Sequence, residues 1–291
     1  MIESDAAMAG KLIRFDWAVK KLLRSKANFG ILEGFLSELL KKDIKIQNIL
    51  ESEGNQENAL DKYNRVDVVV KDENDEIILI ELQVNREADF LSRMLYGTSK
   101  VITEYIVKGE PYEKVKKVYS VNILYFDLGH GDDYIYYGST NFIGIHNKDE
   151  LKLSSSQKEV YKRELVSEVY PEYYIIKLNQ FNDVAKDTLD EWIYFLKNEE
   201  VPDNFTAKGL SEAKEKLDSM KLSKNEQAGY KRFLENLHYE ASMVATGKLD
   251  GKIEGRIEGI IQTAKNLKDM GMDVEIIIKA TGLTKEEIDK I

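Results

Sequence analysis

Hydrophobic residues along the chain follow two spacings, and each spacing predicts one kind of element. Apolar residues that recur every three or four positions predict amphipathic helices, and continuous β-branched runs of strand length predict strands. By these patterns we expect helices over residues 17–24, 29–42, 88–108, 184–197, 207–245, 273–280 and 285–291. We expect strands over residues 65–70, 77–84, 118–126, 134–137, 141–145 and 173–178. This order of elements predicts an α/β fold with a mixed central sheet flanked by helices.

The strands predicted over 65–70 and 77–84 carry acids inside apolar sequence, and a charged turn joins them as a hairpin. Asp67 lies in the first strand and Glu81 in the second. A buried carboxylate costs free energy unless it is paired, hydrogen-bonded or bound to a cation. Because side chains on a strand alternate between faces, Glu81 and Gln83 share one face, which Asp67 can share from the neighbouring strand. A divalent metal is the simplest reason for acids at these positions.

The available residue types favour a metal that prefers oxygen ligands. The chain has no cysteine and its three histidines lie far apart, so we expect no zinc site. Mg²⁺ or Mn²⁺ takes one or two carboxylates from a protein and keeps several waters. We therefore expect Asp67, Glu81 and the backbone carbonyl of Leu82 to bind the metal. Gln83 can orient a water whose pKa the metal lowers.

At these residues the chain resembles the core of the PD-(D/E)XK nucleases. A lone Asp67 followed by Glu81-Leu82-Gln83 is similar to the motif of the Rpn branch, which comprises recombination-promoting nucleases and transposase-like proteins. The resemblance covers roughly residues 10–290, and its other matching positions are Phe15, Asp16, Lys20, Lys21, Phe90, Arg93, Tyr96, Trp192, 109–112 and 282–288. It implies a restriction-endonuclease-like core and a metal-dependent DNA endonuclease that hydrolyses phosphodiester bonds.

Two positions depart from the general motif of this superfamily. Val66 replaces a proline and Gln83 replaces a lysine. An amide stabilises the charge that develops on a phosphate less well than an ammonium does. The chain is therefore either a slow nuclease or a nuclease-fold module that binds DNA or protein. A role in transposition rests only on the family resemblance.

Two further residues each have two interpretations. Asp16 precedes Trp17 where the cap of the first helix is expected, and it can instead add an acid to the metal site. Arg93 can hold a phosphate of the DNA or form a surface salt bridge. Both residues are kept as accessory candidates.

The charge and composition of the chain limit which cofactors and which cellular location we expect. The net charge of −10 at pH 7 argues against broad attraction to nucleic acid, but Lys114, Lys116 and Lys117 form a local basic cluster. We expect no nucleotide cofactor, because the chain has neither a Walker-type loop nor a dinucleotide glycine fingerprint. No apolar run approaches the length of a membrane span, and the first residues lack signal-peptide character. We therefore expect a cytoplasmic protein.

A tetrapeptide repeat marks the start of the C-terminal tail. Small and apolar residues each recur every four positions, as Gly247, Gly251, Gly255 and Gly259, and as Leu249, Ile253, Ile257 and Ile261. On a helix, basic residues form one row and acidic residues form another. The tail is expected either to join copies of the protein or to be a flexible linker. The predicted domains are a nuclease-like domain over 1–200, a helical extension over 201–246 and an oligomerisation segment over 247–291.

Overall fold

The computed structural model describes residues 12–21, 25–50, 68–105, 111–218 and 221–291. The chain divides into two compact units, Met1–Leu222 and Ser223–Ile291. The domain boundaries near residues 200 and 247 remain predictions. In the part of the chain that the structure describes, no helix has both the length and the hydrophobicity that crossing a membrane requires.

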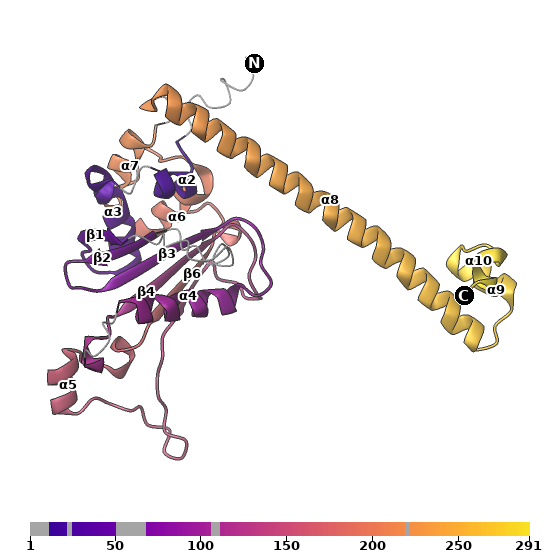
Figure 1. Cartoon of the computed structure of the whole chain (residues 1–291), viewed down its shortest axis with the longest axis horizontal. Coiled ribbons are helices and arrows are strands. Elements are labelled where there is room, and N and C mark those ends of the chain that lie inside the picture. The colour runs from indigo at the N-terminus through magenta and orange to yellow at the C-terminus, as the bar shows by residue number, and fades with distance from the viewer. Residues whose placement is uncertain (1–11, 22–24, 51–67, 106–110, 219–220) are drawn as a thin grey trace. The chain divides into compact units, whose positions relative to one another are not determined.

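A six-stranded mixed sheet forms the centre of the first unit (Figure 1). The spatial order of its strands is β1 (Ile46–Leu50), β2 (Val68–Asp72), β3 (Ile77–Gln83), β4 (Val118–Leu124), β6 (Glu172–Lys177) and β5 (Ile135–Gly138). Strands β3, β4 and β6 are parallel to one another, whereas β1 pairs with β2 and β5 pairs with β6 in antiparallel fashion. Strands β2 and β3 form the expected hairpin, with Val69 opposite Leu79. The prediction of a mixed sheet is confirmed.

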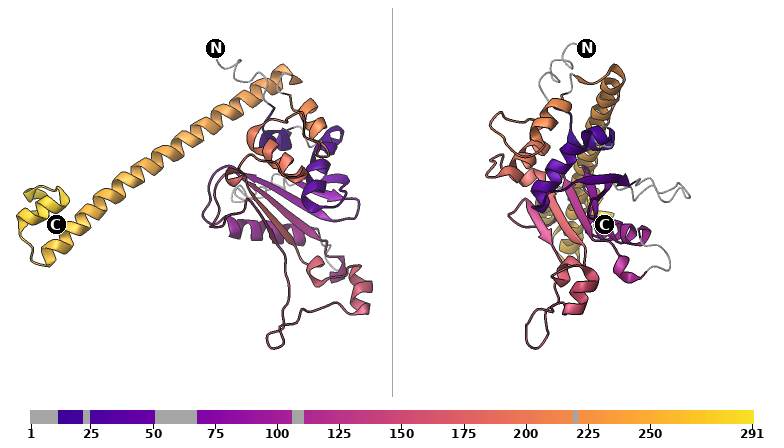
Figure 2. Two further views of the ribbon diagram at one scale, coloured as in Figure 1. Left: turned by 180° about the vertical axis from the view of Figure 1, so that it is seen from behind. Right: turned by 90° about the vertical axis from the view of Figure 1, so that its left-hand side faces the viewer.

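Helix α4 (Phe90–Glu104) covers the sheet face to which Glu81 belongs, and four other helices lie on the opposite side (Figures 1 and 2). Val101 of α4 packs against Leu79 and Val118. Phe90 at the start of α4 packs against Leu124 at the end of β4. The first turn of α4 therefore lies near the end of the sheet where Glu81 and Gln83 are located, and its last turns lie near the start of β4.

The opposite face is covered by α2 (Phe15–Lys21), α3 (Phe29–Leu40), α6 (Thr188–Asn198) and α7 (Leu210–Lys216). An aromatic cluster joins these helices, with ring centroids 5.9 Å apart for Phe15 and Phe35 and 5.6 Å apart for Phe35 and Trp192. Helix α3 approaches the backbone of Lys208 so closely that it needs a glycine at the contact. A Cβ at Gly34 would lie 2.3 Å from the carbonyl oxygen of Lys208. Trp192 Nε1 donates a hydrogen bond to that same carbonyl at 3.1 Å.

Several elements differ from the prediction. Strand β1 and helix α5 (Ser155–Tyr161) were not expected, because β1 has two exposed polar residues and α5 buries no side chain. The strand expected over 141–145 is wrong, since only an isolated bridge joins Ile143 to Glu150. The helix expected over 207–245 is two helices, because Ser223 caps a new one with its side chain.

The second unit consists of α8 (Lys224–Asp269), α9 (Val274–Thr281) and α10 (Lys285–Asp289). A small core of Ala264, Ile277 and Ile288 packs the two short helices against the end of α8. The repeat that begins at Gly247 is helical throughout, and nothing lies within 4 Å of the point where a Cβ on any of its four glycines would project. The repeat is therefore an exposed stretch of helix.

Candidate active site

Glu81 is a buried carboxylate at the end of β3, with only 4% of the residue exposed. It faces α4, and its Oε1 atom lies 2.7 Å from Nε of Arg93 on that helix. Its neighbours Ile80 and Leu82 point to the other, apolar face of the strand. A charge in this position needs a partner, and Arg93 provides the counter-charge.

Gln83 and Arg93 both bind Glu87, which lies in the loop after β3. Gln83 Nε2 donates to Glu87 Oε1 at 2.8 Å, and Arg93 Nη1 donates to the same oxygen at 2.7 Å. Gln83 also donates to the carbonyl of Asn85 at 3.2 Å. These bonds join Glu81, Gln83, Glu87 and Arg93 into one cluster. Glu87 was not singled out from the sequence, where its only signal is an acid four residues after Gln83.

The acidic residues of this cluster stabilise the protonated form of Arg93. Burial by itself would lower the pKa of Arg93, but the charges of Glu81 and Glu87 and their hydrogen bonds outweigh it and raise that pKa. The guanidinium therefore remains protonated and neutralises Glu81 at any physiological pH. The surface-salt-bridge interpretation of Arg93 understates its role, because the pair with Glu81 is largely buried.

Asn122 places an unpaired oxygen beside Glu81. The two residues are partners in the parallel register of β3 and β4, so their side chains lie on the same face. Asn122 Nδ2 donates to the Ser120 hydroxyl at 3.0 Å and to the carbonyl of Tyr174 at 3.2 Å. Its Oδ1 atom is buried and has no hydrogen-bond partner among the described residues. A buried unpaired amide oxygen typically costs about 1–3 kcal/mol, so this atom is available to a ligand.

Asp16 is the second residue of α2, so the prediction that it caps the helix is wrong. Arg14 binds both oxygens of its carboxylate, with Nη2 at 2.9 Å and Nε at 3.2 Å. The Arg14 guanidinium also lies 4.8 Å from the centre of the Tyr125 ring, and the Tyr125 amide donates to the carbonyl of Gln83. Asp16 is thus linked to the end of β3 through Arg14 and Tyr125.

The residues of this region fit a hard divalent cation. Asp67, the other predicted ligand, lies outside the described residues. Within the described ranges, no group of three or more Asp, Glu, His or Cys side chains could hold a metal ion. Glu81, Gln83 and Asn122 nevertheless offer oxygen atoms on one face of the sheet, a donor set that suits Mg²⁺ or Mn²⁺.

Comparison with known proteins identifies the family. Residues 13–247 match the PD-(D/E)XK nuclease family transposases. The match spans most of the chain, and the chain belongs to this family of nucleases. It confirms the expected resemblance and, with the mixed sheet and its flanking helices, the restriction-endonuclease-like α/β fold. No curated protein and no solved structure matches the chain.

Proposed function

We propose that the protein is a metal-dependent DNA endonuclease that hydrolyses phosphodiester bonds at the end of β3. The observation that carries this proposal is the buried Glu81, which is held by Arg93 at 2.7 Å and has the unpaired Oδ1 of Asn122 beside it in register. Folding alone favours apolar residues at such positions. A bound cation would give the Asn122 oxygen a partner and would lie beside the Glu81 carboxylate. We expect this activity in the cytoplasm.

Asp67 and Glu81 would hold Mg²⁺ or Mn²⁺, together with the carbonyl of Leu82, and Asn122 Oδ1 is a further oxygen for the same ion. When bound, such a metal lowers the pKa of a water and neutralises charge on the phosphate. The protein itself neutralises Glu81 through Arg93 when no metal is present. Nη1 and Nε of Arg93 are used by Glu87 and Glu81, and its remaining donors can hold a phosphate.

Gln83 has a defined orientation in this mechanism. Its Nε2 is fixed by Glu87 and by the carbonyl of Asn85. The amide oxygen is thereby left as an acceptor of a hydrogen bond from the attacking water, which it can hold in line. Glu87 is then a positioning residue that acts through Gln83.

A second candidate function is a nuclease-fold module that binds DNA or a protein partner without useful catalysis. The presence of Gln83 in place of the general lysine favours it, because an amide stabilises the transition state less well. A role in recombination or transposition is compatible with either function. The two candidates differ in whether the phosphodiester bond is broken.

Cleavage of supercoiled plasmid in Mg²⁺, in Mn²⁺ and in EDTA separates the two functions. The endonuclease proposal predicts nicked or linear DNA with either metal and none in EDTA. Equal cleavage in all three conditions would contradict the metal mechanism. DNA binding without cleavage in any condition would favour the binding module.

We further propose that α8 joins copies of the protein through its repeat. The apolar residues of the repeat have exposed fractions of 40–58%, and they are Leu249, Ile253, Ile257 and Ile261. The four glycines allow a second helix to approach closely, as small residues four apart do in other helix pairs. A basic row of Lys248, Lys252 and Arg256 and an acidic row of Asp250, Glu254 and Glu258 can each face the other row of a second copy. Two copies would bring two active sites to the two strands of DNA.

A further inference from the structure

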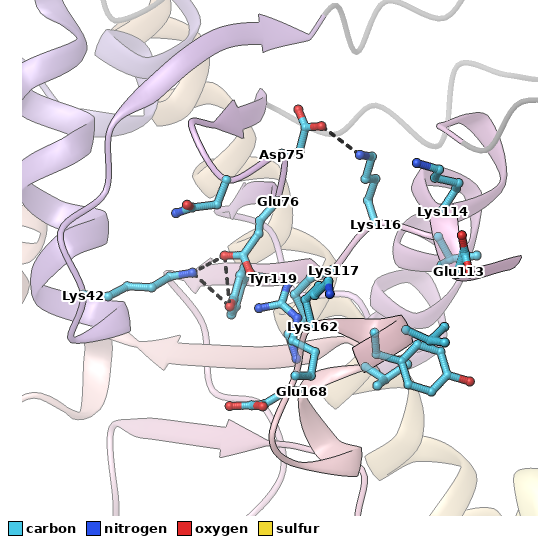
Figure 3. Close-up of a pocket in the computed structure, with 16 residues that line it drawn as sticks. Lys42, Asp75, Glu76, Glu113, Lys114, Lys116, Lys117, Tyr119, Lys162 and Glu168 are labelled. Carbon is cyan, nitrogen blue, oxygen red and sulfur yellow. Dashed lines mark hydrogen bonds and ion pairs between the residues drawn. The ribbon is translucent and has the colours of Figure 1, made fainter. Parts of the chain in front are cut away.

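A cavity of about 840 Å³ lies at the other end of β3, away from Glu81 and Gln83 (Figure 3). Its walls are the turn between β2 and β3, the segment 113–117 that leads into β4, and residues 160–163 at the end of α5. A strand rises roughly 3.3 Å per residue, so the two ends of β3 are roughly 20 Å apart. The cavity is therefore separate from the candidate active site.

The lining of this cavity is basic, although the whole chain carries a net charge of −10. Four acidic residues line it, namely Asp75, Glu76, Glu113 and Glu168. Six cationic residues line it, namely Lys42, Lys114, Lys116, Lys117, Lys162 and Arg163. A concave surface with an excess of one charge focuses the potential and attracts ligands of the opposite sign.

Two of the four acidic residues, Glu76 and Asp75, are paired with cations of the lining. Glu76 is buried and binds two cations at once, Lys42 and Arg163, with Arg163 Nη2 2.6 Å away. Asp75 pairs with Lys116 at 2.9 Å. Glu168 accepts backbone N–H bonds from residues 164 and 165. Glu113 and Glu168 keep their charges, so the six cations exceed the four acids of the lining by two.

Three cationic side chains remain to bind an anion that enters the cavity. Lys114 is exposed and forms no ion pair with any residue that the structure describes. Lys162 has only a 3.6 Å contact with Glu159, and both side chains are highly exposed. Arg163 uses Nη2 for Glu76, and a guanidinium has further N–H donors for a phosphate. Figure 3 shows Lys114 and Lys162 among the residues around the opening.

The cavity also has an apolar part next to these cations. Val115, Val160 and Val169 line it, and so does Tyr161, whose side chain is partly exposed. Cations alone would suit any anion, whereas cations beside an aromatic ring suit a phosphate attached to a sugar and a base. We propose that this cavity binds a nucleoside phosphate, either as a unit of a nucleic acid strand or as a free nucleotide. The proposal does not depend on nuclease activity at Glu81.

Binding of two fluorescent probes in EDTA tests this proposal without any cleavage. The probes are a fluorescein-labelled single-stranded oligonucleotide and a fluorescent analogue of ATP. The test variant is Lys114→Glu combined with Lys162→Glu. The matched control, Lys152→Glu combined with Lys231→Glu, makes the same change of charge at exposed positions outside the cavity. Thermal melting of both variants checks that they fold.

We expect the cavity variant to bind a probe about tenfold more weakly than wild type, a loss of about 1.4 kcal/mol, and the control to stay within about twofold. A loss confined to the oligonucleotide identifies a nucleic acid strand as the ligand. A loss of binding to the ATP analogue identifies a free nucleotide. Equal weakening by both variants, no weakening by the cavity variant, or no binding of either probe to wild type would overturn the proposal.

Discussion

The Nε atom of Arg93 lies 2.7 Å from Oε1 of Glu81, so helix α4 supplies the counter-charge for an acid buried in strand β3. The same guanidinium reaches Glu87 at 2.7 Å, and Glu87 in turn holds Gln83. The cluster therefore has a structural role in addition to the function proposed for it. A substitution of Glu81, the proposed metal ligand, also removes this ion pair.

Glu81→Gln should lower the free energy of unfolding by about 1–3 kcal/mol, because Arg93 loses a charged partner in a largely buried site. Urea denaturation of the purified variant measures this change. Glu104→Gln, an exposed substitution on α4, the helix that carries Arg93, is the control and should change stability by less than about 0.5 kcal/mol. A Glu81→Gln variant as stable as the wild type would show that the pair with Arg93 contributes nothing.

Gln83→Ala should slow DNA cleavage at least tenfold, or about 1.4 kcal/mol of activation free energy, because the water loses its acceptor. Gln83→Lys should retain or raise the rate, since an ammonium offsets charge on the scissile phosphate. Single-turnover cleavage at saturating metal measures both. Unchanged cleavage by the alanine variant would mean that Gln83 only packs against Glu87.

Glu76, an acidic residue that lines the cavity, should make the stability of the protein depend on pH. Burial tends to raise the pKa of Glu76, but the hydrogen bonds and charges of Lys42 and Arg163 outweigh it and lower that pKa below 4.5. The unfolded chain therefore takes up this proton first as pH falls. The stabilisation is fully present above about pH 4.5 and is lost as pH falls through the folded pKa.

Glu76→Gln should remove this part of the pH dependence. Its free energy of unfolding at pH 7 should be lower than that of the wild type, and it should fall less steeply between about pH 5 and pH 3. Denaturation at several pH values measures both slopes. Parallel curves for the two proteins would argue against a lowered pKa at Glu76.

The alternation of residues was enough to predict that Glu81 is a buried acid in a strand and that Gln83 shares its face, because an acid between apolar neighbours stands out. It could not predict Asn122, whose position beside Glu81 depends on the parallel register of β3 and β4. Helix α4 lies between these two strands in the chain, so no short turn fixes their register. The contact between Glu87 and Gln83 likewise depends on the path of the loop after β3. The spacing of hydrophobic residues in the sequence carries no information about that path.

The repeat in the C-terminal tail leads to a prediction about the oligomeric state of the protein. Truncation after Thr246 should give a folded monomer, while the full chain should form a larger species. Burial of Ile253, Ile257 and Ile261 against a partner is worth about 1.5–3 kcal/mol for each fully buried side chain. Light scattering on both proteins decides between these states. The same number of chains per particle in both proteins would mean that the repeat does not join copies.

Plasmid cleavage by wild type, Asp67→Asn and Glu81→Gln, compared side by side in Mg²⁺ and in EDTA, tests the proposed nuclease site. Circular dichroism confirms that the variants are folded before the rates are compared. The predicted result is metal-dependent nicking or linearisation by the wild type and none by either folded variant. Wild-type rates in both variants, or cleavage by the wild type in EDTA, would contradict a metal-dependent site at these two carboxylates.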